Sequence, residues 1–290
     1  MIKQVQKETE PLLLLKYFNI FRHPLRLDEI LKFSGKTETV IELEAYLDEL
    51  IAAGTISKMG NYYLYEGDQQ YIDKREKGEA YAARLIPKAK RSARFIALFP
   101  FVKFVGISGS LSKGYADEKT DFDFFIVTAA NTLWICRTLL HLVKKMSYLI
   151  GKQHSMCMNY FIDEQKLELE EKNIFTQIEL STLIPVYNQD MYRLILLSNK
   201  NNLPNLQHLG LDIDEDEYNT ASLLIKEKNT WWRPLNILLM KLTDAKWRKK
   251  WKKNGYPMSD YALALKTTPY ISKNHPKNYQ KIILNHLQTH

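Results

Sequence analysis

Residues 104–128 of this 290-residue chain read FVGISGSLSKGYADEKTDFDFFIVT, and this stretch decides how the fold is interpreted. An apolar run of strand type ends at Gly109 and Ser110, a polar loop follows, and a second apolar run begins around Asp121 and Asp123. Alternate residues of a strand face the same side, about 6 to 7 Å apart, so we expect the two aspartates to project together. Two like charges so close repel each other unless a cation compensates them.

The residues around the two apolar runs predict a site for a metal ion and a triphosphate. Asp121 and Asp123 are oxygen ligands without a neighbouring His or Cys, which favours Mg²⁺ or Mn²⁺. Such a carboxylate pair can hold two ions about 4 Å apart at the two ends of a phosphoryl transfer. Across the loop, Gly109 lets backbone N–H groups approach an anion, while Ser110 adds a hydroxyl donor and Lys113 an ammonium group.

The segment at residues 109–127 resembles the signature of the DNA polymerase β-like nucleotidyltransferase superfamily. That signature is Gly-Ser, a spacer, and then Asp-x-Asp followed by apolar residues. The resemblance implies that Gly109 and Ser110 bind the phosphates of an NTP, and that Asp121 and Asp123 are the catalytic, metal-binding carboxylates. It also implies the reaction, which is transfer of a nucleoside monophosphate from an NTP to a hydroxyl acceptor with release of pyrophosphate.

One position departs from the superfamily pattern, in which a following strand usually carries a third carboxylate. The strand expected at residues 155–162 presents Ser155, Cys157 and Asn159 on its more polar face. Asn159 occupies the position of the third acid, and an amide cannot take a proton from a nucleophile. Asp163, at the end of that strand, is the alternative acid.

The hydrophobic pattern divides an α/β (α+β) chain into four parts. Residues 96–165 hold two strands, a crossover helix and a third strand, which predicts a small α/β unit. The resemblance implies that this unit is a mixed-sheet nucleotidyltransferase core. Residues 67–95 read as a charged connecting helix that Pro87 interrupts. Residues 166–290 are expected to form a helical, basic C-terminal region.

The remaining part, residues 1–66, reads as three helices and a hairpin around Gly60, an order similar to a winged helix. The third helix is expected to begin after Thr37 as N-cap and to end at Gly54. It has no Lys or Arg, and its acids would be repelled by phosphates, so we expect a structural or protein-docking role for this module. These acids are Glu38, Glu42, Glu44, Asp48 and Glu49.

The net charge of +8 comes from 41 basic and 33 acidic residues, and it is concentrated in one region. Residues 244–290 hold ten Lys or Arg against two Asp, a balance of +8, whereas residues 1–243 hold 31 of each sign. The run KWRKKWKK at residues 246–253 places Trp247 and Trp251 on one helix face, where we interpret them as core anchors. The clustered cations predict a polyanion partner, such as a nucleic acid or the nucleotide's own phosphates.

The composition predicts a cytoplasmic protein without a membrane partner. Apolar stretches are too short to cross a bilayer, and the N-terminal leucine run is too short for a signal peptide. Cys136 and Cys157 are expected to be buried free thiols. The acceptor stays open among nucleic acid, protein and small molecule. Two other functions also stay open: a catalytically weakened nucleotide-binding or sensing protein, and a nucleic-acid-binding regulator that uses the basic C-terminal region.

Overall fold

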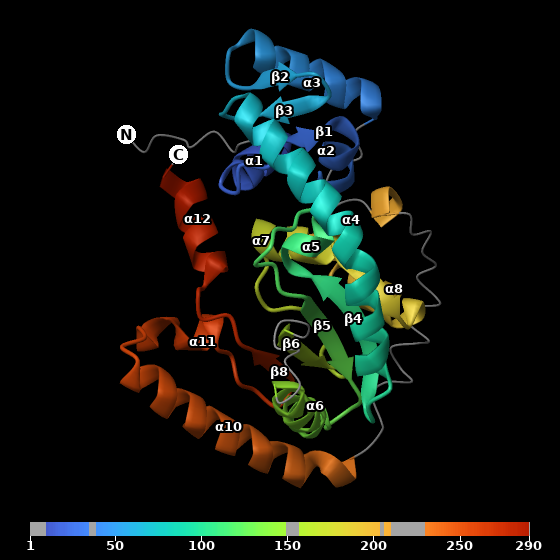
Figure 1. Ribbon diagram of the computed structural model, residues 1–290, viewed down its shortest axis with the longest axis vertical. Coiled ribbons are helices and arrows are strands. Elements are labelled where there is room, and N and C mark those ends of the chain that lie inside the picture. The colour runs from blue at the N-terminus through green and yellow to red at the C-terminus, as the bar shows by residue number, and fades with distance from the viewer. Residues whose placement is uncertain (1–9, 35–38, 149–156, 204–205, 210–229, 290) are drawn as a thin grey trace.

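The computed structural model describes residues 10–34, 39–148, 157–203, 206–209 and 230–289, and over these ranges the protein is a mixed α/β structure. Figure 1 shows two sheets at different heights of the molecule. One is a small three-stranded sheet near the N-terminal end, and the other is a five-stranded sheet in the middle.

The three-stranded sheet packs with three helices from the first part of the chain. Its strand order is β1-β3-β2, with both pairs antiparallel. Leu14, Ile30 and Leu43 from the three helices share one buried cluster, which Ile178 and Ile283 complete from far along the chain. The N-terminal module therefore shares its core with the rest of the protein. Its elements are α1 (Glu10–Asn19), β1 (Leu25–Arg26), α2 (Leu27–Phe33), α3 (Val40–Ala52), β2 (Ser57–Met59) and β3 (Tyr62–Leu64).

Helix α3 begins two residues later than the sequence analysis expected. Thr39 is its N-cap: the Thr39 hydroxyl accepts the N–H of Glu42 at 3.3 Å, and the Glu42 carboxylate accepts the N–H of Thr39 at 2.9 Å. This reciprocal pair is a capping box, which satisfies two N–H groups that the helix cannot bond itself. The prediction of Thr37 as the cap was wrong, and Thr37 itself lies outside the described residues.

The five-stranded sheet has the order β7-β4-β5-β6-β8. Strands β5 and β6 are parallel, and α6 forms the crossover between them, as the sequence analysis expected; the other three pairs are antiparallel. Both edge strands come from residues 166–290, where only helices were expected. The strands and the crossover helix are β4 (Val102–Ser108), β5 (Asp123–Thr128), α6 (Leu133–Tyr148), β6 (Cys157–Asp163), β7 (Ile184–Tyr187) and β8 (Ile271–Lys273).

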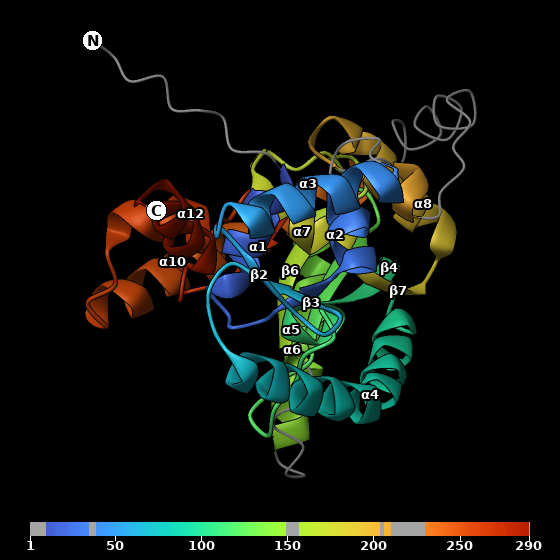
Figure 2. The ribbon, with the colours of Figure 1, turned by 90° about the horizontal axis from the view of Figure 1, so that it is seen from above.

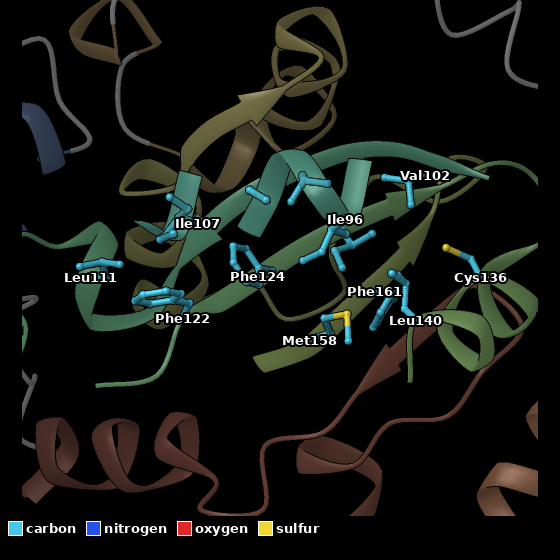
Figure 3. Packing of buried hydrophobic residues seen from close by; sticks show 14 of the residues in the cluster. Ile96, Val102, Ile107, Leu111, Phe122, Phe124, Cys136, Leu140, Met158 and Phe161 are labelled. Atoms are coloured by element: carbon cyan, nitrogen blue, oxygen red, sulfur yellow. The ribbon is translucent and has the colours of Figure 1, made fainter. Parts of the chain in front are cut away.

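Helices cover both faces of this sheet. On one face, Phe124 and Phe161 of the central strands pack with Ile96 of α4 (Gln69–Ala97) and Leu140 of α6 (Figure 3). On the other face, a second cluster joins the strands to α8. The remaining helices are α5 (Gly109–Ser112), α7 (Ile174–Ser181), α8 (Gln189–Ser198), α10 (Arg233–Lys253), α11 (Tyr261–Ala264) and α12 (Tyr279–Thr289), with 3-10 turns η1 (Lys200–Asn202), η2 (Leu206–Leu209), η3 (Thr230–Trp232) and η4 (Met258–Asp260).

Helix α4 connects the two sheets and runs through Pro87 without ending, so the predicted interruption was wrong. Seen from above, the helix changes direction along its length (Figure 2), as expected where a proline removes a helical hydrogen bond. Gly78 in its first half lies against Tyr115, where an added Cβ would stand 2.2 Å from Tyr115 Cδ2. The Gly78 carbonyl also accepts the N–H of Ala116 at 3.1 Å. The loop between β4 and β5 is thereby fixed to α4.

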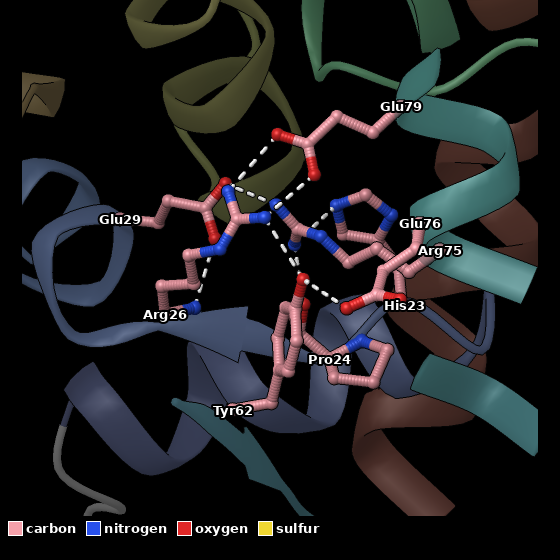
Figure 4. Close-up of polar contacts among 8 residues, drawn as sticks. All are labelled: His23, Pro24, Arg26, Glu29, Tyr62, Arg75, Glu76 and Glu79. Carbon is pink, nitrogen blue, oxygen red and sulfur yellow. Dashed lines mark hydrogen bonds and ion pairs between the residues drawn. The ribbon is translucent and has the colours of Figure 1, made fainter. Parts of the chain in front are cut away.

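Arg75 of α4 is buried at the junction with the N-terminal module (Figure 4). Its guanidinium donates to Glu29 Oε1 at 2.5 Å, to His23 Nε2 at 2.8 Å and to the carbonyl of Pro24. Because arginine has no acceptor atom, the His23 nitrogen must accept, which requires a neutral ring. Burial, reinforced by the positive charge of Arg75, lowers the pKa of His23 to about 3 and keeps the ring neutral.

We expect Arg75→Met to lower the free energy of unfolding by about 3 kcal/mol, because it leaves a half-buried carboxylate and a buried carbonyl without their donor. The neighbouring Arg26–Glu79 pair is a matched comparison, since its side chains are 34% and 41% exposed. Glu79→Gln should cost less than about 1 kcal/mol. Urea denaturation measures both, and equal costs would show that burial does not distinguish the two pairs.

The two cysteines differ in burial, so the sequence analysis was only half right. Cys136 of α6 is buried, and burial raises its thiol pKa to about 12, whereas Cys157 at the start of β6 is half-buried. Both thiols are free.

Within the described ranges, none of the helices combines the length and the apolar character that crossing a bilayer requires.

Candidate functional site

The candidate site lies where β4 runs into α5 and β5 begins (Figure 1). Ser108 at the end of β4 pairs with Asp123 at the start of β5. Gly109, the next residue, has a φ of +74°, and a Cβ there would stand 2.5 Å from Asp123 Oδ2. Only glycine combines the left-handed backbone with this close approach. The sequence-predicted Gly109 and Asp123 are therefore direct neighbours.

The loop that begins at Gly109 forms a single helical turn, α5. The Gly109 carbonyl accepts the Ser112 hydroxyl at 2.9 Å and the Lys113 ammonium at 3.1 Å. The Ser110 carbonyl accepts the N–H groups of Lys113 and Tyr115, both at 3.0 Å. The Ser110 side chain is exposed. These bonds hold the turn rigidly and leave the serine hydroxyl facing solvent.

Asp121 and Asp123 do not sit on one strand face as expected. Strand β5 begins at Asp123, which is half-buried, while Asp121 precedes the strand and is exposed. The two carboxylates still interact, because the charge of Asp121 contributes to the raised pKa of Asp123. The side chain between them, Phe122, is buried in the core against the sheet (Figure 3).

Burial, and then the negative charges of Glu179 and Asp121, raise the pKa of Asp123 to about 6. A hydrogen bond from Asn159 and the positive charge of Lys113 act in the opposite direction. A carboxyl group with this pKa takes up a proton or a cation readily near neutral pH, which is typical of functional sites.

Asn159 of β6 lies beside Asp123, in the position where a third carboxylate was sought. Its Nδ2 donates to Asp123 Oδ1 at 3.1 Å. The amide thus orients the aspartate and partly compensates its charge, but it cannot accept a proton. Of the other residues on the polar face of this strand, Cys157 pairs with Asp123 in the β5–β6 ladder, and Ser155 lies outside the described residues.

Asp163 cannot replace the missing acid, because it lies at the opposite end of β6. It pairs with Thr128 at the far end of β5, whereas Cys157 pairs with Asp123. Its fully buried carboxylate accepts the N–H of Asn131 at 2.7 Å and that of Gln165 at 3.0 Å. Asp163 therefore organises the loop that leads into α6.

Glu179 of α7 is a third carboxylate near the site that sequence reasoning missed. Lys113 Nζ donates to Glu179 Oε1 at 2.7 Å, and the side chains are 12% and 28% exposed. Glu179 is also the largest source of negative charge acting on Asp123. The positive charge of Lys113 thus acts on Asp123, but the ammonium group itself is bonded to a glutamate. Residues 174–181 read as an ordinary amphipathic helix, so no local signal distinguishes this acid.

A metal ion at this site would have two carboxylates as protein ligands. Within the ranges that the structure describes, no three His, Cys, Asp or Glu side chains are grouped closely enough to hold a metal ion. Mg²⁺ is commonly bound through one or two carboxylates, with waters and substrate phosphates as its other ligands, so Asp121 and Asp123 fit this type of site.

The chain was compared with protein-family models, with curated proteins and with solved structures, and none of the three comparisons gave a match. The function must therefore be argued from the residues of the site themselves.

Asp123→Asn should stabilise the metal-free protein at pH 7.5 by on the order of 1–3 kcal/mol, because it removes a charge that burial and two acids oppose. Between the ordinary pKa of about 3.8 and about 6, the folded state holds a proton that the unfolded state releases, so native stability falls as pH rises. The stabilisation should therefore disappear near pH 4.

Urea denaturation at both pH values measures this effect, with Glu118→Gln in the same exposed loop as the control. A loss of stability at pH 7.5 in the Asp123 variant would contradict the proposed charge conflict.

Proposed function

We propose that the protein is a metal-dependent nucleotidyltransferase of the DNA polymerase β-like kind. The observation that carries the proposal is the approach of Gly109 to Asp123. This approach places a glycine-serine turn, where phosphates can reach backbone N–H groups, beside a carboxylate. The raised pKa of this carboxylate means that a bound cation would stabilise its charged form. The order of elements supports the same assignment: a strand, the Gly-Ser turn, a second strand that begins at the last residue of Asp-x-Asp, a crossover helix and a parallel strand.

In this proposal, different residues of the site bind different parts of the substrate. Asp121 and Asp123 hold Mg²⁺ or Mn²⁺, which when bound neutralises phosphate charge. The N–H groups of the first helical turn and the Ser110 hydroxyl bind the β and γ phosphates of the NTP. Lys113 exchanges Glu179 for a phosphate oxygen. The acceptor hydroxyl attacks the α-phosphorus, and pyrophosphate leaves. The hydroxyl proton passes to solvent water, because the Asn159 amide cannot accept it.

A second candidate is a nucleotide-binding protein with weak catalysis, and the bond from Asn159 to Asp123 favours it. The Asn159 amide partly compensates the negative charge of Asp123. A carboxylate in its place would add negative charge and could accept a proton. Slow turnover with intact nucleotide binding is the result expected for this alternative.

A nucleic-acid-binding regulator, which would act through the basic residues near the C-terminus, is a third candidate and is distinguished by salt-dependent binding to nucleic acid.

The N-terminal module is proposed to be a winged helix that does not read DNA. The order α1, α2, α3 and then the β2–β3 hairpin supports the winged-helix assignment. The exposed acids of α3 would repel a duplex; they are Glu42, Glu44, Asp48 and Glu49. Glu38, the fifth acid of the predicted helix, lies outside the described residues.

We expect Asp121→Asn combined with Asp123→Asn to abolish both Mn²⁺ binding and Mg²⁺-dependent transfer from a labelled NTP, because no charged metal ligand remains. Titration with Mn²⁺ by electron paramagnetic resonance measures binding, and transfer is measured by incubating labelled NTP with a cell extract as the source of acceptor. Glu118→Gln should leave both unchanged. Undiminished metal binding in the double variant would refute the assignment of the metal site.

Asn159→Asp should raise the transfer rate by about tenfold or more, since general-base help is typically worth about 10²- to 10⁴-fold. The substitution should also remove the hydrogen bond from Asn159 to Asp123 and place two carboxylates side by side. Because these carboxylates repel each other, the metal-free variant should unfold at a lower temperature. Added Mg²⁺ should restore that loss in the variant and change the wild type less. A fast wild type that the substitution slows would show that the proton acceptor is another group.

A further inference from the structure

The outer face of α10 is an exposed apolar surface at a distance from the candidate site. Leu235, Leu238 and Leu242 follow one another at helical spacing and are 40%, 53% and 59% exposed. Trp231, in the turn η3 that leads into the helix, is 92% exposed. A contiguous apolar surface of this kind marks an interaction site.

The same face becomes cationic in the second half of the helix. Lys246, Lys249 and Lys253 continue the helical spacing of the leucines and are exposed. Asp244 is the single acid of α10, and it accepts the buried Tyr261 hydroxyl at 2.9 Å. The outer face therefore has an apolar half and a cationic half, with its acid bonded to a neighbouring helix.

The turn before α10 contacts the segment that follows α4. The ring of Phe101 lies 5.5 Å from that of Trp232, and Leu98, at the end of α4 three residues earlier, is 80% exposed. Figure 1 shows α10 lying across the lower end of the molecule, with α5 and the candidate site above the sheet on the other side. A large flat partner on α10 would thus leave the site open.

We propose that the outer face of α10 is a docking surface for an anionic lipid bilayer, on which the protein lies without crossing it. One planar surface then satisfies both halves: the acyl boundary takes the leucines and Trp231, and the headgroup phosphates take the lysines. The sequence analysis expected no membrane partner because no segment can span a bilayer, but surface docking requires no span.

Two other occupants match the face less well. A nucleic acid would pair with the lysines but would leave the leucine row in water. A second copy of the same face would bring no acid to the lysines, because the only acid of α10 is already bonded to Tyr261. A bilayer is the occupant that complements both halves.

Vesicle flotation of the full-length protein tests the proposal. We expect binding to vesicles of phosphatidylcholine with an equal part of phosphatidylglycerol, no binding to phosphatidylcholine alone, and weaker binding at high salt. Tryptophan fluorescence should shift to shorter wavelength as Trp231 leaves water. Leu238→Gln with Leu242→Gln should weaken binding about tenfold or more.

Charge reversal by Lys246→Glu with Lys249→Glu should likewise weaken binding about tenfold or more. The control variants change exposed residues elsewhere and should bind like the wild type: Lys77→Glu with Lys88→Glu on α4, and Ile41→Gln on α3. All changed side chains are exposed, so thermal unfolding should show intact folds.

Three results would overturn the proposal. The first is an absence of flotation with anionic vesicles at low salt. The second is self-association, measured by light scattering, that the leucine variant abolishes while vesicles stay unbound. The third is lysine-dependent binding to nucleic acid without vesicle binding.

Discussion

The backbone at position 109 and the carboxylate of Asp123 occupy neighbouring space at the end of two antiparallel strands. The pairing of Ser108 with Asp123 fixes this arrangement. The register of the two strands determines that Gly109, the residue after Ser108, lies beside the Asp123 carboxylate. A side chain at position 109 would meet the Asp123 oxygen at 2.5 Å. The turn after Gly109, and with it the place of Ser110 and Lys113, depends on this single approach.

Around that approach, the charges of the site are almost but not fully balanced. Lys113 is bonded to Glu179 and Asn159 to Asp123, yet burial, together with the neighbouring acids, still raises the pKa of Asp123 to about 6. Folding thus keeps a carboxylate in surroundings that favour its neutral form. Strongly shifted pKa values of this kind are typical of functional sites.

The parts of the fold that local sequence can specify were predicted from it. The Gly-Ser turn, the crossover helix and the strand with Asn159 all follow from apolar periodicity and from glycine, which act within a few residues. Strands β7 and β8 have four and three residues, too few for a period to be visible, and they form because a neighbouring strand offers them an edge. Pro87 was expected to break a helix that packing against the sheet keeps intact.

The candidate site was predictable to the same extent. The residues of one short loop and two strand ends could be inferred, since a motif brings them together along the chain. Glu179 could not be inferred, because the packing of α7 brings it to Lys113. Helix α7 packs against the N-terminal module, and this contact depends on the whole fold. The start of β5 at Asp123 was also missed, since the pattern of apolar residues extends unchanged to Phe122.

The place of β8 affects the order in which the protein can be completed during synthesis. Strand β6 carries Asn159 and lies between β5 and β8, but β8 is translated long after β6, behind α7, α8 and α10. Until then the nascent chain exposes the hydrogen-bonding groups of β6 along one edge, where another unfinished chain could pair with them. Ribosome-bound intermediates should therefore be most prone to aggregation just before residues 271–273 emerge.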